Sequence, residues 1–155
     1  MTIYVYPFHK LCPKVAKKEF EDNILLGLDR ETGEFLAFYM LELYCADPGC
    51  DCQKVTIMMY EASENPDPTV RATIAYGWGS VPFYQDWGYM TKEEADELRS
   101  GYLEPLEQQG EDAEKLLALF HQHLKNNPDL LPNLKRHYKL FKKEAAKKED
   151  AARRR

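Results

Sequence analysis

The residues of this sequence that could do chemistry are concentrated in one short stretch, where Cys45, Cys50 and Cys52 lie within eight residues. They are spaced C-x4-C-x-C, and the first two are separated by a segment containing Asp47-Pro48-Gly49, which is typical of a tight turn. Thiolates that a turn brings together are typical ligands of zinc, which takes four sulfur or nitrogen donors in a structural site. The spacing therefore predicts that this loop holds a zinc ion.

A fourth ligand has to come from elsewhere in the chain or from solvent. Cys12 is the first candidate, because it is the remaining cysteine of four and enough chain separates it from the loop to fold back. His9 is the substitute, and water is the third candidate. A site closed by four protein ligands is structural and contributes on the order of 10 kcal/mol to folding, whereas a site that keeps a water can be catalytic. We expect a structural site, with these metal ligands: Cys12, Cys45, Cys50 and Cys52.

The same cysteines permit other interpretations. They could be free buried thiols, or Cys50 and Cys52 could be a redox pair, although C-x-C strains a disulfide and no thioredoxin-like pattern surrounds it. A zinc-dependent hydrolase would use the metal of the Cys45 loop with Glu42 or Asp51 as the general base. The His-Glu-x-x-His motif of metalloproteases and the paired motifs of zinc deaminases are absent from the sequence. A non-enzymatic interaction or regulatory module is therefore the leading hypothesis.

Length and composition indicate one domain. The 155 residues, of which 44% are hydrophobic and 30% charged, suit one core, and we predict a single domain over 1–146 and a basic, frayed tail over 147–155. No apolar run approaches the ~20 residues of a membrane span, and the first residues lack the pattern of a signal peptide. We therefore expect a cytoplasmic protein without a membrane partner, whose cysteines stay reduced and available to a metal.

The hydrophobic pattern changes along the chain from a period of two to a helical period. Strands are predicted over 2–6, 24–29, 35–44, 55–61 and 70–76, and helices over 13–22, 91–106, 113–124 and from about 132. The segment 83–89 is predicted to be an aromatic-rich connection, and Thr91 with Glu94 matches a helical capping box. Strands followed by helices indicate an α+β fold, in which an antiparallel β-meander has the C-terminal helices packed on one face and a cysteine knuckle on a hairpin.

The C-terminal helix is basic, although the whole chain has a net charge of −5. From Lys125 onward there are 11 basic and 4 acidic residues, against 10 basic and 22 acidic residues before it. The charge run that contains Lys135, Arg136, His137 and Lys139 is predicted to be a solvated helix face. Such a face could contact a protein or another acidic partner, and nucleic-acid binding through it is the third hypothesis for function.

Four segments of the sequence, taken in order, resemble a family of uncharacterised bacterial proteins. They read Leu-Tyr-Cys-x-Asp-Pro-Gly-Cys-Asp-Cys over 43–52, Ala-Thr-Ile-x-Tyr-Gly-Trp over 72–78, Phe-Tyr-x-x-Trp over 83–87 and Leu-Lys-Arg-His-Tyr-x-Leu-Phe over 134–141. The resemblance implies that these separated segments form one unit, in which the cysteine loop, the Gly-Trp turn and the basic helix adjoin. It implies no particular activity.

Overall fold

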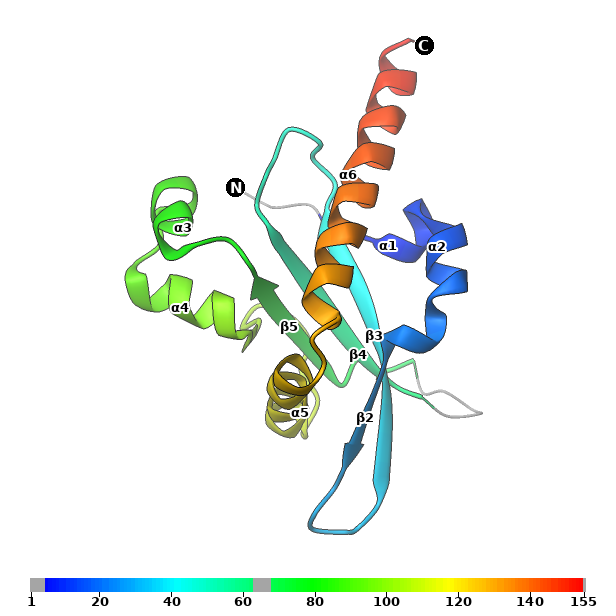
Figure 1. Cartoon of the computed structure of the whole chain (residues 1–155), viewed down its shortest axis with the longest axis vertical. Helices are drawn as coiled ribbons and strands as arrows, with labels where there is room; N and C mark the ends of the chain where they lie inside the picture. The colour runs from blue at the N-terminus through cyan, green and yellow to red at the C-terminus, as the bar shows by residue number, and fades with distance from the viewer. Residues whose placement is uncertain (1–4, 63–67, 155) are drawn as a thin grey trace.

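The structure of this chain is a computed structural model that describes residues 5–62 and 68–154. An antiparallel sheet lies at its centre, with helices over one face and at both sides (Figure 1). The strands are β1 (Val5–Pro7), β2 (Ile24–Leu28), β3 (Phe35–Cys45), β4 (Lys54–Glu61), β5 (Ala72–Gly77) and β6 (Tyr102–Leu103). The helices are α1 (Phe8–Leu11), α2 (Pro13–Lys18), the 3-10 helix η1 (Phe20–Asn23), α3 (Val81–Gly88), α4 (Lys92–Ser100), α5 (Ala113–Asn126) and α6 (Leu130–Arg153). The predicted α+β class is confirmed.

The long strand β3 organises the sheet. It pairs with β4 along one edge, while β2 pairs with its first part and β1 with its last part. Strand β4 pairs in turn with β5, and the short β6 completes the order β1-β3-β4-β5-β6. All of these pairings are antiparallel, as the alternating apolar runs predicted. Cys45 ends β3 and the connection to β4 carries Cys50 and Cys52, so the three clustered cysteines lie at one end of the sheet.

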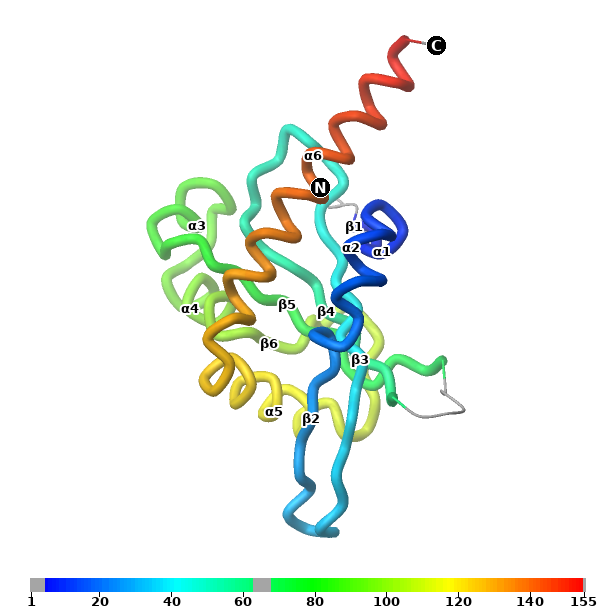
Figure 2. Tube along the Cα trace, turned by 45° about the vertical axis from the view of Figure 1, so that its right-hand side comes forward, coloured from blue at the N-terminus to red at the C-terminus, as the bar shows by residue number. Residues whose placement is uncertain are grey.

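Helices α5 and α6 cover one face of the sheet, and α6 continues past the end of the sheet (Figure 1 and Figure 2). Side chains that alternate toward this face meet the apolar stripes of the two helices. The Tyr76 ring of β5 contacts Phe120 of α5 with ring centroids 5.7 Å apart, and Tyr44 of β3 contacts Phe141 of α6 at 5.6 Å. All four residues are buried, so one core joins the sheet to both helices.

The aromatic segment predicted as a connection is instead largely helical, as α3. Ser80 supplies the missing start signal, because its hydroxyl accepts a hydrogen bond from the Phe83 backbone N–H at 3.1 Å. Pro82 occupies the first turn, where a residue without an N–H donor costs nothing. Tyr84 is fully buried, and Leu98 of α4 joins it in a second, smaller core.

The helix that follows begins as predicted but ends sooner. Thr91 caps α4 by accepting a hydrogen bond from the Glu94 N–H at 3.1 Å, which confirms the predicted start of the helix. Gly101 has φ +94°, a conformation that ends the helix and suits glycine alone. Tyr102 therefore lies in β6 and not on a helical stripe reaching Leu106, which is 92% exposed.

The two ends of the chain also differ from the predicted boundaries. Of the first predicted strand, over 2–6, only Val5 and Tyr6 lie within the described residues, and they belong to β1, which extends to Pro7. The stretch from Lys147, predicted as a frayed tail, continues α6 as far as Arg153. Among the helices of the described residues, none combines the length and the apolar character that crossing a membrane requires.

Candidate metal centre

Cys45, Cys50 and Cys52 come together at the end of the β3–β4 hairpin, with their sulfur atoms all within 4.8 Å of one another. Cys45 and Cys52 are buried, and Cys50 is half-buried. Around a tetrahedral zinc with Zn–S bonds of about 2.3 Å, sulfur atoms stand roughly 3.8 Å apart. The three donors therefore need only small movements to share one metal ion, and soft thiolates are the donors that zinc prefers.

A local turn brings the cysteines into this arrangement. The Asp47 side chain accepts a hydrogen bond from the Gly49 N–H at 2.9 Å, and the Asp47 carbonyl accepts another from the Cys50 N–H at 3.1 Å. Gln53 then turns the chain into β4 with a left-handed φ of +51°. Its carbonyl accepts a hydrogen bond from the buried Tyr84 hydroxyl at 2.6 Å, so α3 supports the loop from one side.

Helix α6 supports the loop from the other side. The Lys142 ammonium donates to the carbonyl oxygens of Cys45 at 2.9 Å and Asp47 at 2.7 Å. One turn earlier, the Tyr138 hydroxyl donates to the Asp51 carboxylate at 3.0 Å. The cysteine loop is thus connected to a helix some 90 residues further along the chain. This contact joins two of the segments that the family resemblance implied would adjoin.

The electrostatics of the cluster favour a cation. Burial, together with the nearby Cys52 and Cys45 sulfurs, raises the pKa of Cys50 to about 12, and burial followed by Cys45 also raises the pKa of Cys52. Lys142 opposes both shifts but does not overcome them. Three thiolates this close repel one another, and a bound divalent cation removes that repulsion. The cluster is therefore able to hold a metal ion, and binding would release protons.

The fourth predicted ligand is not a member of this group. Cys12 is buried at the start of α2, where burial and then the Glu144 carboxylate raise its pKa. The substitute, His9, is exposed on α1 and lines a separate pocket with Phe20 and Tyr39. The structure brings together three of the four predicted donors, and completion of the site by Cys12 stays a prediction.

The two predicted bases of a zinc hydrolase are engaged elsewhere. Asp51 accepts from Tyr138 and from the Gln53 amide at 3.0 Å, and neither it nor Glu42 belongs to the cysteine group. Glu42 is 3% exposed and contacts His137 of α6, whose Nδ1 lies 2.8 Å from the Glu42 carboxylate. Hydrolysis stays a hypothesis for which neither carboxylate is placed among the cysteines.

The structure corrects the predicted position of His137. It was expected on the solvated basic face but is only 2% exposed, because it shares the buried side of α6 with Leu134 and Phe141. These residues are spaced i, i+3 and i+7, which is the helical signal for a common face. A second signal was Glu42, a carboxylate within an otherwise apolar strand, since a buried acid needs a donor or a cation.

Two aromatic residues that follow β5, Tyr84 and Trp78, pack against other parts of the protein. The Tyr84 hydroxyl accepts a hydrogen bond from the Gly79 N–H at 3.1 Å, and a Cβ at Gly77 would overlap that hydroxyl. Trp78 meets Tyr138 of α6 edge to face, with ring centroids 5.3 Å apart. Together these contacts bring the Gly-Trp turn to the same end of the sheet as the cysteine loop.

Comparison of the chain with protein-family models, with curated proteins and with solved structures gave no match.

Proposed function

We propose that this chain is a zinc-stabilised, non-enzymatic interaction module that binds an acidic protein segment through the exposed basic side of α6. The observation that carries the proposal is the division of α6 into two sides. Arg136 and Lys142 are bound to other elements of the fold. Lys135, Lys139 and Lys143 are exposed, and within the described ranges they form no ion pair. These three cations of α6 are therefore available to a partner.

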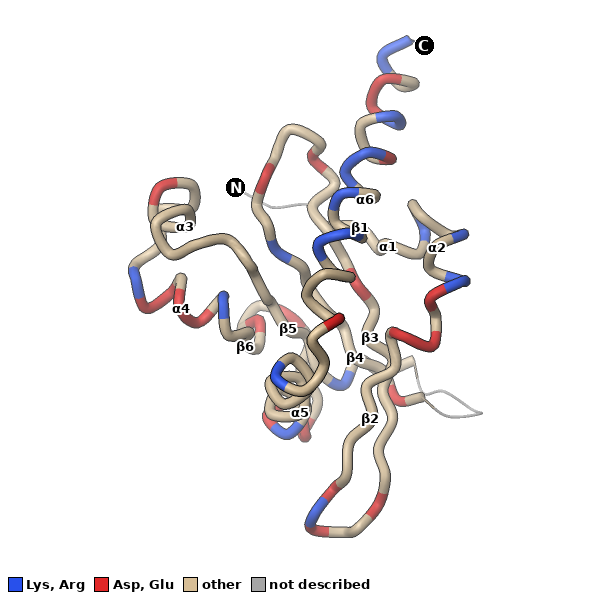
Figure 3. The backbone as a smooth tube through the Cα atoms, in the orientation of Figure 1, with Lys and Arg blue, Asp and Glu red and all other residues tan. Residues whose placement is uncertain are grey.

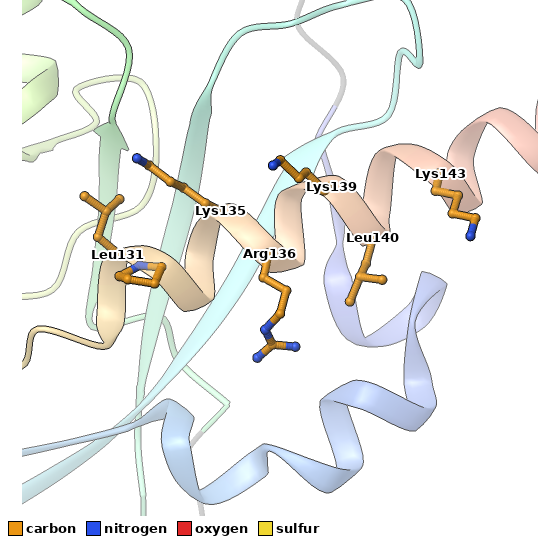
Figure 4. A pocket seen from close by; sticks show the side chains of 7 residues that line it. Leu131, Lys135, Arg136, Lys139, Leu140 and Lys143 are labelled. Atoms are coloured by element: carbon orange, nitrogen blue, oxygen red, sulfur yellow. The ribbon is translucent and has the colours of Figure 1, made fainter.

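These lysines lie beside apolar side chains of the same helix. They follow one another at intervals of four residues, so they form a stripe along α6. Leu131 and Leu140 lie beside them, and the same residues line a pocket of about 500 Å³ (Figure 4). A segment that carries both carboxylates and apolar side chains could pair with the lysines and cover the leucines. An interface of this kind combines an apolar centre with a charged rim.

The charge distribution favours a short acidic protein segment over nucleic acid. Helix α6 carries eight basic and three acidic residues, whereas the chain as a whole has a net charge of −5, so the remainder carries −10. Basic residues follow α6 along its length with few acidic residues among them, whereas most acidic residues lie in the other elements (Figure 3). A long polyanion would meet the repulsion of this acidic remainder, whereas a short segment needs to contact α6 alone.

Zinc has a supporting part in this proposal. A metal held by Cys45, Cys50 and Cys52 would fix the end of the β3–β4 hairpin, to which Lys142 and Tyr138 attach α6. The ion would thereby hold the binding helix on the sheet. A structural zinc in a small domain contributes folding free energy directly.

The test uses the zinc-loaded full chain and two fluorescent probes of equal charge. One probe is a helix-forming peptide with glutamates four residues apart and leucines between them, and the other is a single-stranded oligonucleotide. The double variant Lys135→Glu/Lys139→Glu changes the proposed surface. The matched control, Lys14→Glu/Lys18→Glu, makes the same change of charge at exposed positions of α2.

We expect the peptide to bind the wild type and the α2 control alike, and to lose about tenfold or more in affinity for the α6 variant. Binding should also weaken with added salt, because the lysines are exposed. Tighter binding of the oligonucleotide than of the peptide would favour the nucleic-acid hypothesis instead. The proposal would be contradicted if neither probe binds, or if the α6 variant and the α2 control lose the same affinity for the peptide.

A further inference from the structure

A buried network of charged side chains joins three parts of the fold away from the cysteine loop. His137 of α6 lies between Glu42 of β3 and Glu19, the residue that follows α2. Its Nδ1 is 2.8 Å from a Glu42 oxygen, and its Nε2 is 3.3 Å from a Glu19 oxygen. The Phe8 ring of α1 stacks on the imidazole at 4.4 Å between centroids. The imidazole thus connects the sheet, the C-terminal helix and the N-terminal helical segment.

Hydrogen-bond geometry shows which groups of this network face one another. Glu42 accepts from the Tyr44 hydroxyl and from the Asn23 amide at 2.9 Å, and its carboxylate also faces Nδ1 of His137. Each imidazole nitrogen therefore faces a carboxylate oxygen. A neutral imidazole has only one N–H, so it would turn a lone pair toward one of the two carboxylates. Only the imidazolium donates to both.

We propose that His137, Glu42 and Glu19 form a proton-operated latch that holds the segment from α2 to η1 against α6 and β3, and that loss of the His137 proton releases this segment. Glu19 also pairs with Arg136 of α6, so the protonated network balances two carboxylates with two cations. When His137 becomes neutral, the buried Glu42 no longer has a cation beside it. The contact between Nε2 and Glu19 then has either no proton to donate or a proton on an uncharged ring. The contact between Glu19 and Arg136 is exposed and holds the segment weakly by itself.

The groups around His137 set the direction of the pH response. Burial by itself would lower the pKa of His137, but the hydrogen bonds and charges of Glu42 and Glu19 outweigh burial, so the pKa is raised. The hydrogen bond from Arg136 lowers the pKa of Glu19 against the effect of burial, and His137 adds to the lowering. The other charged or titratable groups of the pocket beside the network are Glu21, Asp22, His123 and Asp129.

The direction in which pH changes the stability of the latch follows from these pKa shifts. A histidine whose folded pKa is raised stabilises the latch fully below its unfolded pKa, near 6.5, and this contribution disappears as pH rises through the folded pKa. The pKa of Glu19 is lowered in the folded state, so Glu19 stabilises the latch above the pKa that its carboxyl has in the unfolded chain. This stabilisation is lost as pH falls through the folded pKa. The latch is therefore closed below the ordinary histidine pKa of about 6.5 and opens as pH rises through the raised pKa of His137.

The experiment measures hydrogen exchange of the segment 13–23 in the full chain between about pH 6 and about pH 9, with rates corrected for intrinsic exchange, together with an NMR titration of the His137 ring. Strand β4 in the buried sheet is the internal reference. Glu19→Gln removes one carboxylate of the latch. Glu21→Gln is the matched control, since Glu21 is exposed in the same segment.

We expect protection of 13–23 to fall about tenfold or more with rising pH while β4 is unchanged, and the fall to follow the titration of His137. Glu19→Gln should shift both curves to lower pH, and Glu21→Gln should leave them in place. His137→Gln should abolish the pH step, but the inference does not depend on that variant folding. Equal curves for the wild type and Glu19→Gln, or protection of 13–23 that does not change with pH, would overturn the proposal.

Discussion

Replacing Lys142 by methionine tests the connection between α6 and the cysteine loop. The lysine ammonium donates to the carbonyl oxygens of Cys45 and Asp47, and it lies 5.4 Å from the centroid of the Tyr138 ring. Methionine keeps an apolar stem of similar length but has no donor, so it removes the hydrogen bonds and the cation without leaving a large cavity.

The structure gives the size of the expected effect. Each hydrogen bond contributes about 0.5–1.5 kcal/mol net, and bonds from a charged donor contribute more. Because Lys142 is only half-buried, water can partly replace it at the two carbonyls. We therefore expect Lys142→Met to lower the free energy of unfolding by about 1–2 kcal/mol. Lys142 also opposes the raised pKa of Cys50 and Cys52, so the variant should hold a metal less tightly at neutral pH.

Urea unfolding of the metal-free and zinc-loaded chain measures the first effect, and competition with a chromophoric chelator measures the second. The matched control is Lys139→Met, which changes an exposed lysine one turn away, and we expect it to alter stability by less than about 0.5 kcal/mol. Equal stability of the two variants would refute the connection described here. So would zinc affinity that is the same for Lys142→Met and Lys139→Met.

Three further predictions concern the metal, a helix cap and the core. Zinc affinity should fall as pH is lowered, because protons compete with the metal for thiols such as Cys50, whose pKa is raised to about 12. Chelator competition at several pH values measures this affinity, and an affinity that does not change with pH would contradict the prediction. Thr91→Ala should lower the free energy of unfolding by about 1 kcal/mol through loss of the α4 cap, whereas no loss in denaturant unfolding would show that the cap is dispensable. Phe120→Ala should lower it by about 3–5 kcal/mol, since Phe120 is fully buried between α5 and the sheet, and a loss under 1 kcal/mol by the same measurement would place the residue outside the core.

Local patterns in the sequence were sufficient for most of the fold. Apolar runs separated by turn residues predicted the strands of the meander, and the capping box at Thr91 predicted the start of α4. The prediction for the aromatic segment after β5 missed helix α3. Aromatic side chains give no strong helical signal, and the start of this helix depends on the Ser80 cap and on Pro82. The early end of α4 depends on one glycine with a positive φ.

The candidate site was predictable in its local part only. Three cysteines within one turn meet by local geometry, but the position of Cys12 depends on how α1 and α2 pack. The contact between Glu42 and His137 spans 95 residues of sequence, so no local pattern identifies the two residues as partners. Two local anomalies indicate only that each residue needs a partner, because one is an acid within an apolar strand and the other is a histidine on an apolar helix face. Such anomalies indicate partners even when the partner cannot be identified.

X-ray absorption at the zinc edge, measured on the purified full chain, tests the proposed metal centre most directly. We expect one zinc ion per chain with at least three sulfur ligands at about 2.3 Å, and loss of that sulfur signal in Cys52→Ser. The number of sulfur ligands also shows whether a fourth thiolate, such as that of Cys12, completes the site. A chain that binds no zinc, or that binds it through nitrogen and oxygen donors alone, would contradict the account.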